Sequence, residues 1–447
     1  MKLEEHPTVK SFVERAATSP AMDRTRKLES SWLREVCLNA GADDVGFVEV
    51  DRPEIADQRR NILEVFPDAK TLVSIALRMN REPIRAPARS VANVEFHHTS
   101  HEVNGVMHKI VQTLETSGVK ALSPAAGFPM EMDRFTHGKT WVVSHKPVAV
   151  AAGLGQMGIH RNVIHPRFGN FIILGTVLVD AEVTAHSKPI NYNPCLECKL
   201  CVSACPTGAI EPDGHFNFSA CYTHNYREFI GGFTDWVGRI AGSKNRADYR
   251  KWVSDTESAS MWQSLSFGAN YKAAYCMEVC PAGEDVIGPF LTDRKGFLEN
   301  AVRPLQDKKE AVYVVPGSDA EAYVTRRFPH KTPKQVSNGL RAPSIRSFLA
   351  VLPLLFQRHQ SEGLNAAYHF TFTGEEPRRA TVVIRNRTIQ VQEGHMGVAD
   401  IRITADSRTW LRFLAKEGSI VWALLRRKIR IKGSPRLLRS FGRCFPS

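Results

Sequence analysis

A chain of 447 residues is too long for one ordinary hydrophobic core, so two or three domains are expected. Hydrophobic residues make up 43% of the chain and charged residues 23%, which is typical of a globular protein and excludes a disordered one. No apolar run reaches the roughly 18–20 residues that cross a bilayer, and the formal charge of +13 suits nucleic acid, anionic lipid or acidic protein partners without choosing among them.

The first part of the chain has an α/β pattern. Residues 1–30 contain neither an apolar signal segment nor a twin-arginine pair, so we expect a cytoplasmic protein, with residues 1–23 as an N-terminal extension. Apolar spacing predicts helices at 33–40 and 103–117. Extended patterns predict strands at 45–50, 71–77, 140–144, 147–151 and 171–179. Residues 24–189 are therefore interpreted as one α/β domain.

The rest of the chain divides into three parts. Residues 190–299 hold seven of the nine cysteines and few regular elements, and 300–344 have the weak periodicity of a connector. From residue 345 to 447, a helix at 348–360 precedes a group of strands and then two helices, which predicts a separate α+β domain. The strands are predicted at 368–373, 380–386, 388–392, 400–404 and 428–431, and the helices at 407–417 and 420–425. The end of this domain is strongly basic, because residues 426–443 include eight basic residues and no acidic one.

Four cysteines form a motif with short, regular gaps. The sequence Cys195-x2-Cys198-x2-Cys201-x3-Cys205-Pro206 is the pattern with which bacterial ferredoxins hold iron–sulfur clusters. Two-residue gaps wrap a loop around one cluster, while the fourth cysteine faces a second cluster. A structural zinc site is the alternative, but zinc sites seldom use three consecutive short gaps that end in Cys-Pro. The motif therefore predicts an iron–sulfur module with two clusters.

The partner motif of the second cluster is incomplete. Cys276-x3-Cys280-Pro281 is the tail of such a motif, and Cys221 is a further candidate ligand. By the crossing rule of two-cluster ferredoxins, the first cluster is a four-iron cubane held by Cys195, Cys198, Cys201 and Cys280. The second cluster is left with Cys205, Cys221 and Cys276.

A complete second motif would place a cysteine three residues before Cys276, where the sequence has Ala273. The second cluster is therefore expected to be a three-iron cluster or a four-iron cluster with an unusual fourth ligand. Cys37 and Cys444 are the remaining thiols that could be recruited, although an ordinary buried thiol is the commoner role for such residues.

A glycine-rich segment precedes the cysteines. Gly153-x-Gly155-x-x-Gly158 matches the dinucleotide-binding fingerprint. However, His165-Pro166 and a strand pattern follow soon after it, which leaves no room for the crossover helix that the fingerprint requires. Dinucleotide binding is therefore not expected at this segment.

Together with the cysteine motif, this segment resembles the epoxyqueuosine reductase and reductive dehalogenase superfamily over about residues 25–290. The phrases Gly41-Ala-Asp-Asp-Val-Gly46 and Phe66-Pro67 fit the same family. The resemblance implies a nitroreductase-like α/β core that holds cobalamin, and a ferredoxin-like module whose two clusters supply electrons for reductive cleavage of a C–O or C–halogen bond. Cofactor contacts, where glycines would let the backbone approach a large flat ring, are implied for Gly153, Leu154, Gly155, Met157, Gly158 and Asn162.

The resemblance does not fix the residue that supplies the proton. Epoxyqueuosine reductases have an aspartate general acid upstream of the glycine segment, and this sequence has Ser144 there. Histidine and tyrosine side chains suit protonation of a leaving oxygen or a carbanion. The candidates are His145, His160, Tyr222, His224 and Tyr226. The last three follow Cys221 directly, where a side chain could reach between cluster and cofactor.

The C-terminal part resembles the sterol-carrier-protein lipid-binding domain over about residues 345–447. Its marks are the segments 370–377, 399–406 and 432–434. The resemblance implies an apolar tunnel for a lipid or acyl ligand, or else a dimerisation module and hence a homodimer. Apolar side chains of the predicted helices are expected to cover the sheet, namely Trp410, Leu411, Phe413, Leu414, Trp422 and Leu425.

Three functions are consistent with these features. The leading one is an iron–sulfur and corrinoid-dependent reductase of a lipophilic or aromatic substrate, with a ferredoxin or flavodoxin as electron donor. The second is an electron-transfer protein that holds clusters without a corrinoid. The third is an epoxyqueuosine-type tRNA-modifying reductase, but the sequence lacks the helical tRNA-binding repeat of that family, so nucleic acid is not expected as a partner.

Overall fold

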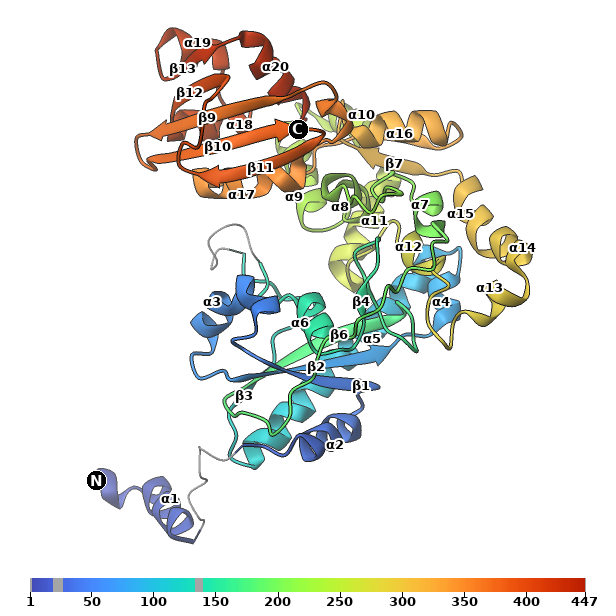
Figure 1. Ribbon diagram of the computed structural model, residues 1–447, viewed down its shortest axis with the longest axis vertical. Coiled ribbons are helices and arrows are strands. Elements are labelled where there is room, and N and C mark those ends of the chain that lie inside the picture. Colours follow the sequence, from blue (N-terminus) through green and yellow to red (C-terminus); the bar gives the residue numbers. More distant parts are fainter. Residues whose placement is uncertain (1, 19–26, 133–139, 447) are drawn as a thin grey trace.

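The computed structural model describes residues 2–18, 27–132 and 140–446, and Figure 1 shows its parts arranged along the long axis. The N-terminal α/β domain lies towards one end, the cysteine-bearing segment in the middle and the C-terminal domain at the other end. Residues Pro7–Thr18 form helix α1, and the predicted boundary between residues 23 and 24 lies outside the described residues. Within the described ranges, no helix is both long and apolar enough to cross a bilayer.

The N-terminal domain is built on an antiparallel sheet with the strand order β1-β2-β6-β3. Its strands are β1 (Asp44–Glu49), β2 (Thr71–Arg78), β6 (Ile172–Val179) and β3 (Ala121–Leu122). In β2, Val73 pairs with Phe47 on one side and with Val177 on the other. All but the last residue of β2 are buried, which explains its continuous apolar run. These strands confirm the predictions at 45–50, 71–77 and 171–179.

Helices cover both faces of this sheet. They are α2 (Ser30–Ala40), α3 (Ala56–Val65), α4 (Arg81–Arg85), α5 (Arg89–Thr116) and α6 (His145–Ala151). Leu33 of α2 and Ile110 of α5 pack with Val73 in one core. Ile62 of α3 and Val148 of α6 belong to the core on the opposite face. The domain is therefore a three-layer α/β/α arrangement, in agreement with the predicted fold class.

Two predicted strands in this domain are wrong. Residues 147–151 belong to helix α6, and residues 140–144 form no strand. A short apolar run cannot be assigned to a strand or a helix by periodicity alone. Here Val148, Ala149 and Ala151 face one core, and Pro147 stands in the first helical turn, where its missing N–H costs no hydrogen bond.

The cysteine-bearing segment is more regular than its sequence suggested. Its helices are α7 (Leu200–Ala204), α8 (Phe218–Asn225), α9 (Gly231–Gly242), α10 (Arg246–Trp252), α11 (Asp255–Phe267) and α12 (Tyr275–Glu278). The side chains of Asn217, Asn245 and Ser254 cap the first turns of α8, α10 and α11. Such capping residues are the sequence signal that could have revealed these helices.

Residues 300–344 are folded and do not form a loose connector. Three short helices, α13 (Gly288–Thr292), α14 (Arg294–Phe297) and α15 (Arg303–Asp307), lead into this part of the chain. Strands β7 (Ala311–Val314) and β8 (Thr332–Gln335) then pair in parallel, with α16 (Asp319–Arg327) between them. Val312 and Val324 pack in the same core as Cys201 and Ala204. The expected connector is therefore a β-α-β unit that completes the core of the cysteine-bearing module.

The C-terminal domain has the predicted α+β layout. Helix α17 (Ile345–Leu355) leads to a five-stranded sheet of order β11-β10-β9-β12-β13, in which only the β9–β12 pair is parallel. The strands are β9 (Ala366–Thr373), β10 (Arg378–Arg385), β11 (Thr388–Glu393), β12 (Ile401–Asp406) and β13 (Ile429–Gly433). The remaining helices are α18 (Ser407–Leu414), α19 (Ile420–Leu425) and α20 (Pro435–Arg443).

Aromatic rings dominate the core of the C-terminal domain. Trp410 is 3% exposed and lies edge-on to Phe348, Phe370 and Phe372 at ring distances of 5.7–5.9 Å. Leu411 and Leu414 also pack on this core, as predicted. The prediction is wrong for Trp422 and Leu425, which are 62% and 68% exposed. Trp422 and Leu425 of α19 therefore face solvent and do not cover the sheet.

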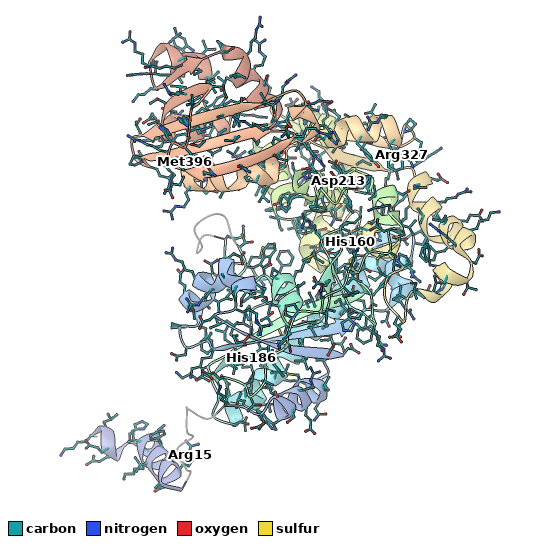
Figure 2. The ribbon with its side chains drawn as sticks, viewed as in Figure 1. Arg15, His160, His186, Asp213, Arg327 and Met396 are labelled. Atoms are coloured by element: carbon teal, nitrogen blue, oxygen red, sulfur yellow. The ribbon has the colours of Figure 1, made fainter. Side chains whose placement is uncertain are left out.

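Polar contacts fasten the C-terminal domain to the cysteine-bearing module. The Arg358 guanidinium pairs with Glu211 at 3.1 Å and with Asp213 at 2.6 Å, and Figure 2 shows Asp213 at this junction. The buried side-chain oxygen of Gln357 accepts hydrogen bonds from the Asp319 N–H and from Asn217. The two parts are therefore joined by specific contacts as well as by the chain.

Candidate functional site

The first cysteine motif forms a loop that continues into helix α7. Cys195 and Cys198 lie in the loop, Cys201 lies in α7, and Cys280 follows α12. Glu197 and Lys199 have the left-handed backbone angles φ 55° and φ 53°, which turn the loop sharply on either side of Cys198. The loop is therefore wound so that sulfur atoms separated by two residues can face a common centre.

These four thiols line one cavity. His160 also lines this cavity and lies near the middle of the molecule (Figure 2). The cavity is small, with a volume of about 20 Å³. Its lining consists of Ile159, His160, Ile164, Pro194, Cys195, Leu196, Glu197, Cys198, Lys199, Cys201, Cys280, Pro281 and Ala282. The chain thus brings Cys280 to the first three cysteines from 79 residues away, as the crossing rule predicts.

The other three motif cysteines form a second set. Among the thiols, Cys276 and Cys205 raise the pKa of Cys221 most strongly. Cys205 is the thiol that raises the pKa of Cys276 most strongly. The thiols of Cys198 and Cys195 raise the pKa of Cys280 more than does Cys276, its neighbour in sequence. Cys201 has Cys276 as its strongest thiol neighbour, followed by Cys280, Cys198 and Cys195, so the assignment of the seven cysteines to two clusters stays a prediction.

The second set has no fourth thiol. Ala273 is partly buried and packs against the same module core as Cys221 and Cys276. Cys37 is buried in the α/β domain and Cys444 in the C-terminal core, where its thiol donates to the Ser440 carbonyl. Both fill the ordinary structural role of a buried cysteine, so neither completes the second set.

Burial is the main influence on the protonation of these thiols. Burial raises the pKa of Cys221, and the neighbouring thiols Cys276 and Cys205 raise it further. Burial also raises the pKa of Cys280 to about 12. Desolvated thiols that crowd together stay protonated unless cations share their charge, and iron ions supply that charge. In the described part of the chain, no three His, Cys, Asp or Glu side chains are grouped around a single-ion site.

The glycine segment packs against itself. It runs into a hairpin of β4 (Gln156–Met157) and β5 (Val163–Ile164) and not into a helix, which agrees with the rejection of a dinucleotide site. A Cβ atom at Gly155 would lie 2.4 Å from the Ile164 carbonyl oxygen, and one at Gly153 would lie 2.5 Å from the Lys188 carbonyl oxygen. Protein backbone therefore packs closely against these glycines where a side chain would stand, and cofactor contact at this segment stays a prediction.

Asn162 connects this hairpin to the second thiol set. Its side-chain amide lies 3.9 Å from the Cys276 sulfur, and its side-chain oxygen accepts a hydrogen bond from Lys146 at 2.9 Å. Lys146 also donates to the Arg161 carbonyl at 2.8 Å. The Lys146 side chain is exposed to solvent. Desolvation by the surrounding protein lowers the pKa of its ammonium group, and the thiols of Cys276 and Cys221 act to raise that pKa. Sequence reasoning missed Lys146, although it lies two residues after Ser144.

The three candidate histidines are occupied by structural contacts. Both ring nitrogens of His145 are hydrogen-bonded, one to the Thr176 hydroxyl and the other to the Ala125 carbonyl. His160 accepts from the Asn162 N–H, and burial lowers its pKa to about 4. His224 is 2% exposed and accepts from the Tyr313 N–H. None of these rings therefore presents a proton to an accessible space.

The two candidate tyrosines differ sharply. Tyr222 is buried, and its hydroxyl accepts the Gly231 N–H at 3.0 Å. Tyr226 is half-buried, packs against Tyr222, Phe229 and Tyr271, and lies in the electrostatic field of Cys221 and Cys276. Burial is the main cause that raises the pKa of Tyr226. Tyr226 is therefore the predicted candidate that remains available beside the second thiol set.

Comparisons with known proteins match two parts of the chain to families. Residues 188–211 match the 4Fe-4S binding domain, and residues 356–446 match the SCP-2 sterol transfer family. An epoxyqueuosine reductase from Gloeobacter violaceus is 30% identical over 156 residues, which cover 35% of this chain and 46% of that protein. One from Aliivibrio fischeri is 33% identical over 158 residues, which cover 35% and 40%. The chain thus spans about half the length of the curated relatives it matches.

Solved structures of the same families are also similar to this chain. A catabolic reductive dehalogenase is 14% identical, with 61% of this chain and 34% of that chain covered and a TM-score of 0.37. An epoxyqueuosine reductase from Streptococcus thermophilus is 14% identical, with 61% and 75% covered and a TM-score of 0.32. An epoxyqueuosine reductase with a modified tRNA stem loop is 17% identical, with 62% and 78% covered and a TM-score of 0.33. The chain is thus similar to epoxyqueuosine reductases over about a third of its length, and separate parts of it match the 4Fe-4S binding domain and the SCP-2 sterol transfer family.

Proposed function

We propose that this protein is an iron–sulfur oxidoreductase that uses cobalamin to cleave a C–O or C–halogen bond in a lipophilic or aromatic substrate. The observation that carries the proposal is the position of the second thiol set. One thiol set lines an interior cavity, while Cys221 and Cys276 of the other lie beside the accessible side chains of Lys146 and Tyr226. Electrons can therefore enter at one set and leave at the other toward a bound molecule.

The residues that would hold each group follow from this arrangement. The first cluster would take Cys195, Cys198, Cys201 and Cys280, and the second would take Cys205, Cys221 and Cys276. Cobalamin would lie beside the second set, where Lys146, Asn162 and Tyr226 offer an ammonium, an amide and a phenol. When bound, the clusters supply single electrons and cobalamin supplies the reducing metal centre.

The chain itself supplies the proton and the polar environment. The phenol of Tyr226 is held by its aromatic neighbours and can donate its proton to the leaving oxygen or to the carbanion of the substrate. The ammonium of Lys146, anchored by Asn162 and the Arg161 carbonyl, can stabilise the negative charge that develops there. Ser144, which replaces the family's aspartate, carries no acidic proton of comparable strength.

The aromatic group beside Tyr226 supports a lipophilic substrate. Phe229 and Tyr271 pack edge to face at 5.0 Å, and Phe128 packs on Phe229 at 6.1 Å with 47% of its surface exposed. Such rings favour flat apolar molecules over highly charged ones.

The test uses anaerobically purified protein with reconstituted clusters and added cobalamin, followed by absorbance and electron paramagnetic resonance. Reduced methyl viologen supplies electrons for turnover of a set of halogenated phenols. Tyr226→Phe should keep iron and cobalamin but lower turnover by about 10²–10⁴-fold, the range for a lost general acid. Tyr222→Phe makes the same change one helical turn earlier and should leave turnover within a few-fold of the wild type. Absence of cobalamin binding to the cluster-replete protein would instead support an electron carrier.

A tRNA-modifying reductase is the second candidate. The curated relatives are epoxyqueuosine reductases, and one such enzyme has been solved with a tRNA stem loop. This finding conflicts with the expectation that nucleic acid is not a partner. The same reconstituted protein, given tRNA that contains epoxyqueuosine, separates the two candidates: conversion to queuosine without dehalogenation would favour this second function.

A further inference from the structure

Helix α19 presents an apolar face to solvent at one end of the molecule. Val421, Trp422 and Leu425 are 61%, 62% and 68% exposed, and Leu424 is 38% exposed. Ala423 of this helix is buried in the domain core, and Ile420 is partly buried and packs against the same core. Figure 1 shows α19 at the top of the C-terminal domain, at the end remote from the α/β domain. The helix is thus held by Ile420 and Ala423, while Val421, Trp422, Leu424 and Leu425 are exposed.

Basic residues surround this apolar face. Arg426, Arg427 and Lys428 follow the helix directly and are all exposed. Further exposed basic side chains come from β13 and α20, namely Arg430, Lys432, Arg436 and Arg439. No acidic residue occurs after Glu417 in the sequence. The Arg426 guanidinium lies 5.8 Å from the centre of the Trp422 ring, so cationic and aromatic groups form one continuous surface.

We propose that α19 and these basic residues dock the protein on an anionic lipid surface. A helix of this length can insert its apolar side chains only into the boundary between headgroups and acyl chains, where tryptophan is favoured. Arginine and lysine side chains around it meet the lipid phosphates, and two weak signals together give stable anchoring. The inference is independent of the reductase chemistry proposed above.

The composition of the face favours lipid over other partners. Single-stranded RNA needs several aromatic rings on which bases stack, whereas Val421, Leu424 and Leu425 are aliphatic. A second copy of the same chain would bring an equally basic surface against this one, and like charges repel. An anionic bilayer offers both an apolar layer and the opposite charge.

The test measures co-sedimentation of the full chain with vesicles. One set consists of phosphatidylcholine alone, and the other contains 30% phosphatidylglycerol. We expect at least tenfold tighter binding to the anionic vesicles in 0.1 M salt and loss of most of this difference in 0.5 M salt. The double variant Trp422→Ser/Leu425→Ser should lose at least tenfold in affinity, and Arg426→Gln/Arg427→Gln should lose selectivity for the anionic vesicles.

A matched control removes equally exposed apolar residues elsewhere. Trp262 and Leu265 of α11 are both 58% exposed, and that helix begins with Asp255 and Glu257. Trp262→Ser/Leu265→Ser should bind vesicles like the wild type, and iron content should be unchanged in all variants. Equal loss in both double variants, equal binding to neutral and anionic vesicles, or no binding to either would overturn the proposal. RNA binding or dimerisation that depends on Trp422, without vesicle binding, would overturn it as well.

Discussion

The side-chain amide of Asn162 lies 3.9 Å from the Cys276 sulfur and so joins the glycine segment to the second thiol set. The same side chain holds Lys146 through its oxygen. One residue therefore couples a potential cluster ligand to the ammonium that faces the proposed reaction space.

The first prediction concerns the reduction potential of the second cluster. Hydrogen bonds to ligand sulfur stabilise the more negative, reduced state and so raise the potential. Asn162→Leu removes the donor at Cys276 and should shift the second cluster to a more negative potential. A redox titration followed by electron paramagnetic resonance measures both clusters in one sample. The first cluster, whose Cys195 sulfur receives the Ile159 N–H, is the internal control, and an equal shift of both clusters would contradict the assignment.

The second prediction concerns iron content. Anaerobically purified protein should hold at least seven irons per chain, because a cubane and a three-iron cluster together contain that number. Cys198→Ala removes a thiol from the cavity of the first set and should lower the iron content by about half. Cys37→Ala removes a buried thiol from the α/β core and should leave iron unchanged. A zinc-containing, iron-free protein would contradict the cluster assignment.

The third prediction concerns the incomplete set. Ala273 occupies the position of the missing cysteine of the second motif and packs against the same core as Cys221 and Cys276, so Ala273→Cys should supply a fourth thiolate. The oxidised wild type should then show a paramagnetic three-iron signal or an unusual ligand, and the variant should show an ordinary cubane instead. Ala282→Cys, which lies at the cavity of the first set, is the control and should leave the second cluster unchanged.

The sequence predicted the cysteine sets and most strands because their signals are local. Cysteine spacing encodes which thiols share a cluster, and alternation along β9 and β12 marks a half-buried sheet. Lys146 could not be recognised in this way, since its importance comes from Arg161 and Asn162, which only the folded hairpin brings to it. The apolar side chains of α19 were predicted to cover the sheet, but apolar composition alone does not say whether a helix face packs against a core or faces solvent.

The β-α-β unit in residues 300–344 was missed for a different reason. Its strands are only four residues long, and β8 (Thr332–Gln335) is mostly exposed and lacks the apolar run expected of a parallel strand. Buried charge holds the unit in place instead. Lys331 is 3% exposed and donates to the Leu305 and Lys308 carbonyls and to Glu310 at 2.8–2.9 Å.

The fourth prediction tests this buried lysine. Lys331→Met leaves the partly buried Glu310 carboxylate without its main partner and should destabilise the module by about 3–5 kcal/mol. Lys308→Met removes a more exposed lysine, 3.3 Å from the same carboxylate, and should cost about 1 kcal/mol or less. Urea unfolding followed by tryptophan fluorescence measures both variants. Equal losses of unfolding free energy in Lys331→Met and Lys308→Met would show that the burial of Lys331 does not determine its contribution to stability.

The difference in unfolding free energy between the wild type and Lys331→Met depends on pH with a defined sign. Burial raises the pKa of the Glu310 carboxyl, but hydrogen bonds from Lys331 and Tyr275 outweigh it, so the pKa lies below its ordinary value of 4.5. The contribution of the carboxylate is therefore complete above about pH 4.5 and is lost as the pH falls through the lowered pKa. Without Lys331, burial should raise the pKa of Glu310 in the variant, so the gap in unfolding free energy should begin to narrow above pH 4.5, where the variant's carboxylate takes up its proton, and should keep narrowing until the wild-type carboxylate is protonated as well.

The last prediction concerns the junction of the C-terminal domain. Arg358 donates hydrogen bonds to both Glu211 and Asp213. The hydrogen bond that it donates to Asp213 is the main cause that raises the pKa of Arg358, so the guanidinium stays charged. Arg358→Ala should loosen the C-terminal domain without affecting the clusters, because neither acid belongs to a thiol set. Limited proteolysis should then cut the irregular segment 336–344 several-fold faster, with unchanged iron content. Arg408→Ala breaks an exposed pair with Glu375 in the same domain and should not change the cleavage rate. Unchanged cleavage in Arg358→Ala would mean that Gln357 and its buried hydrogen bonds to Asn217 and Asp319 fasten the domain alone.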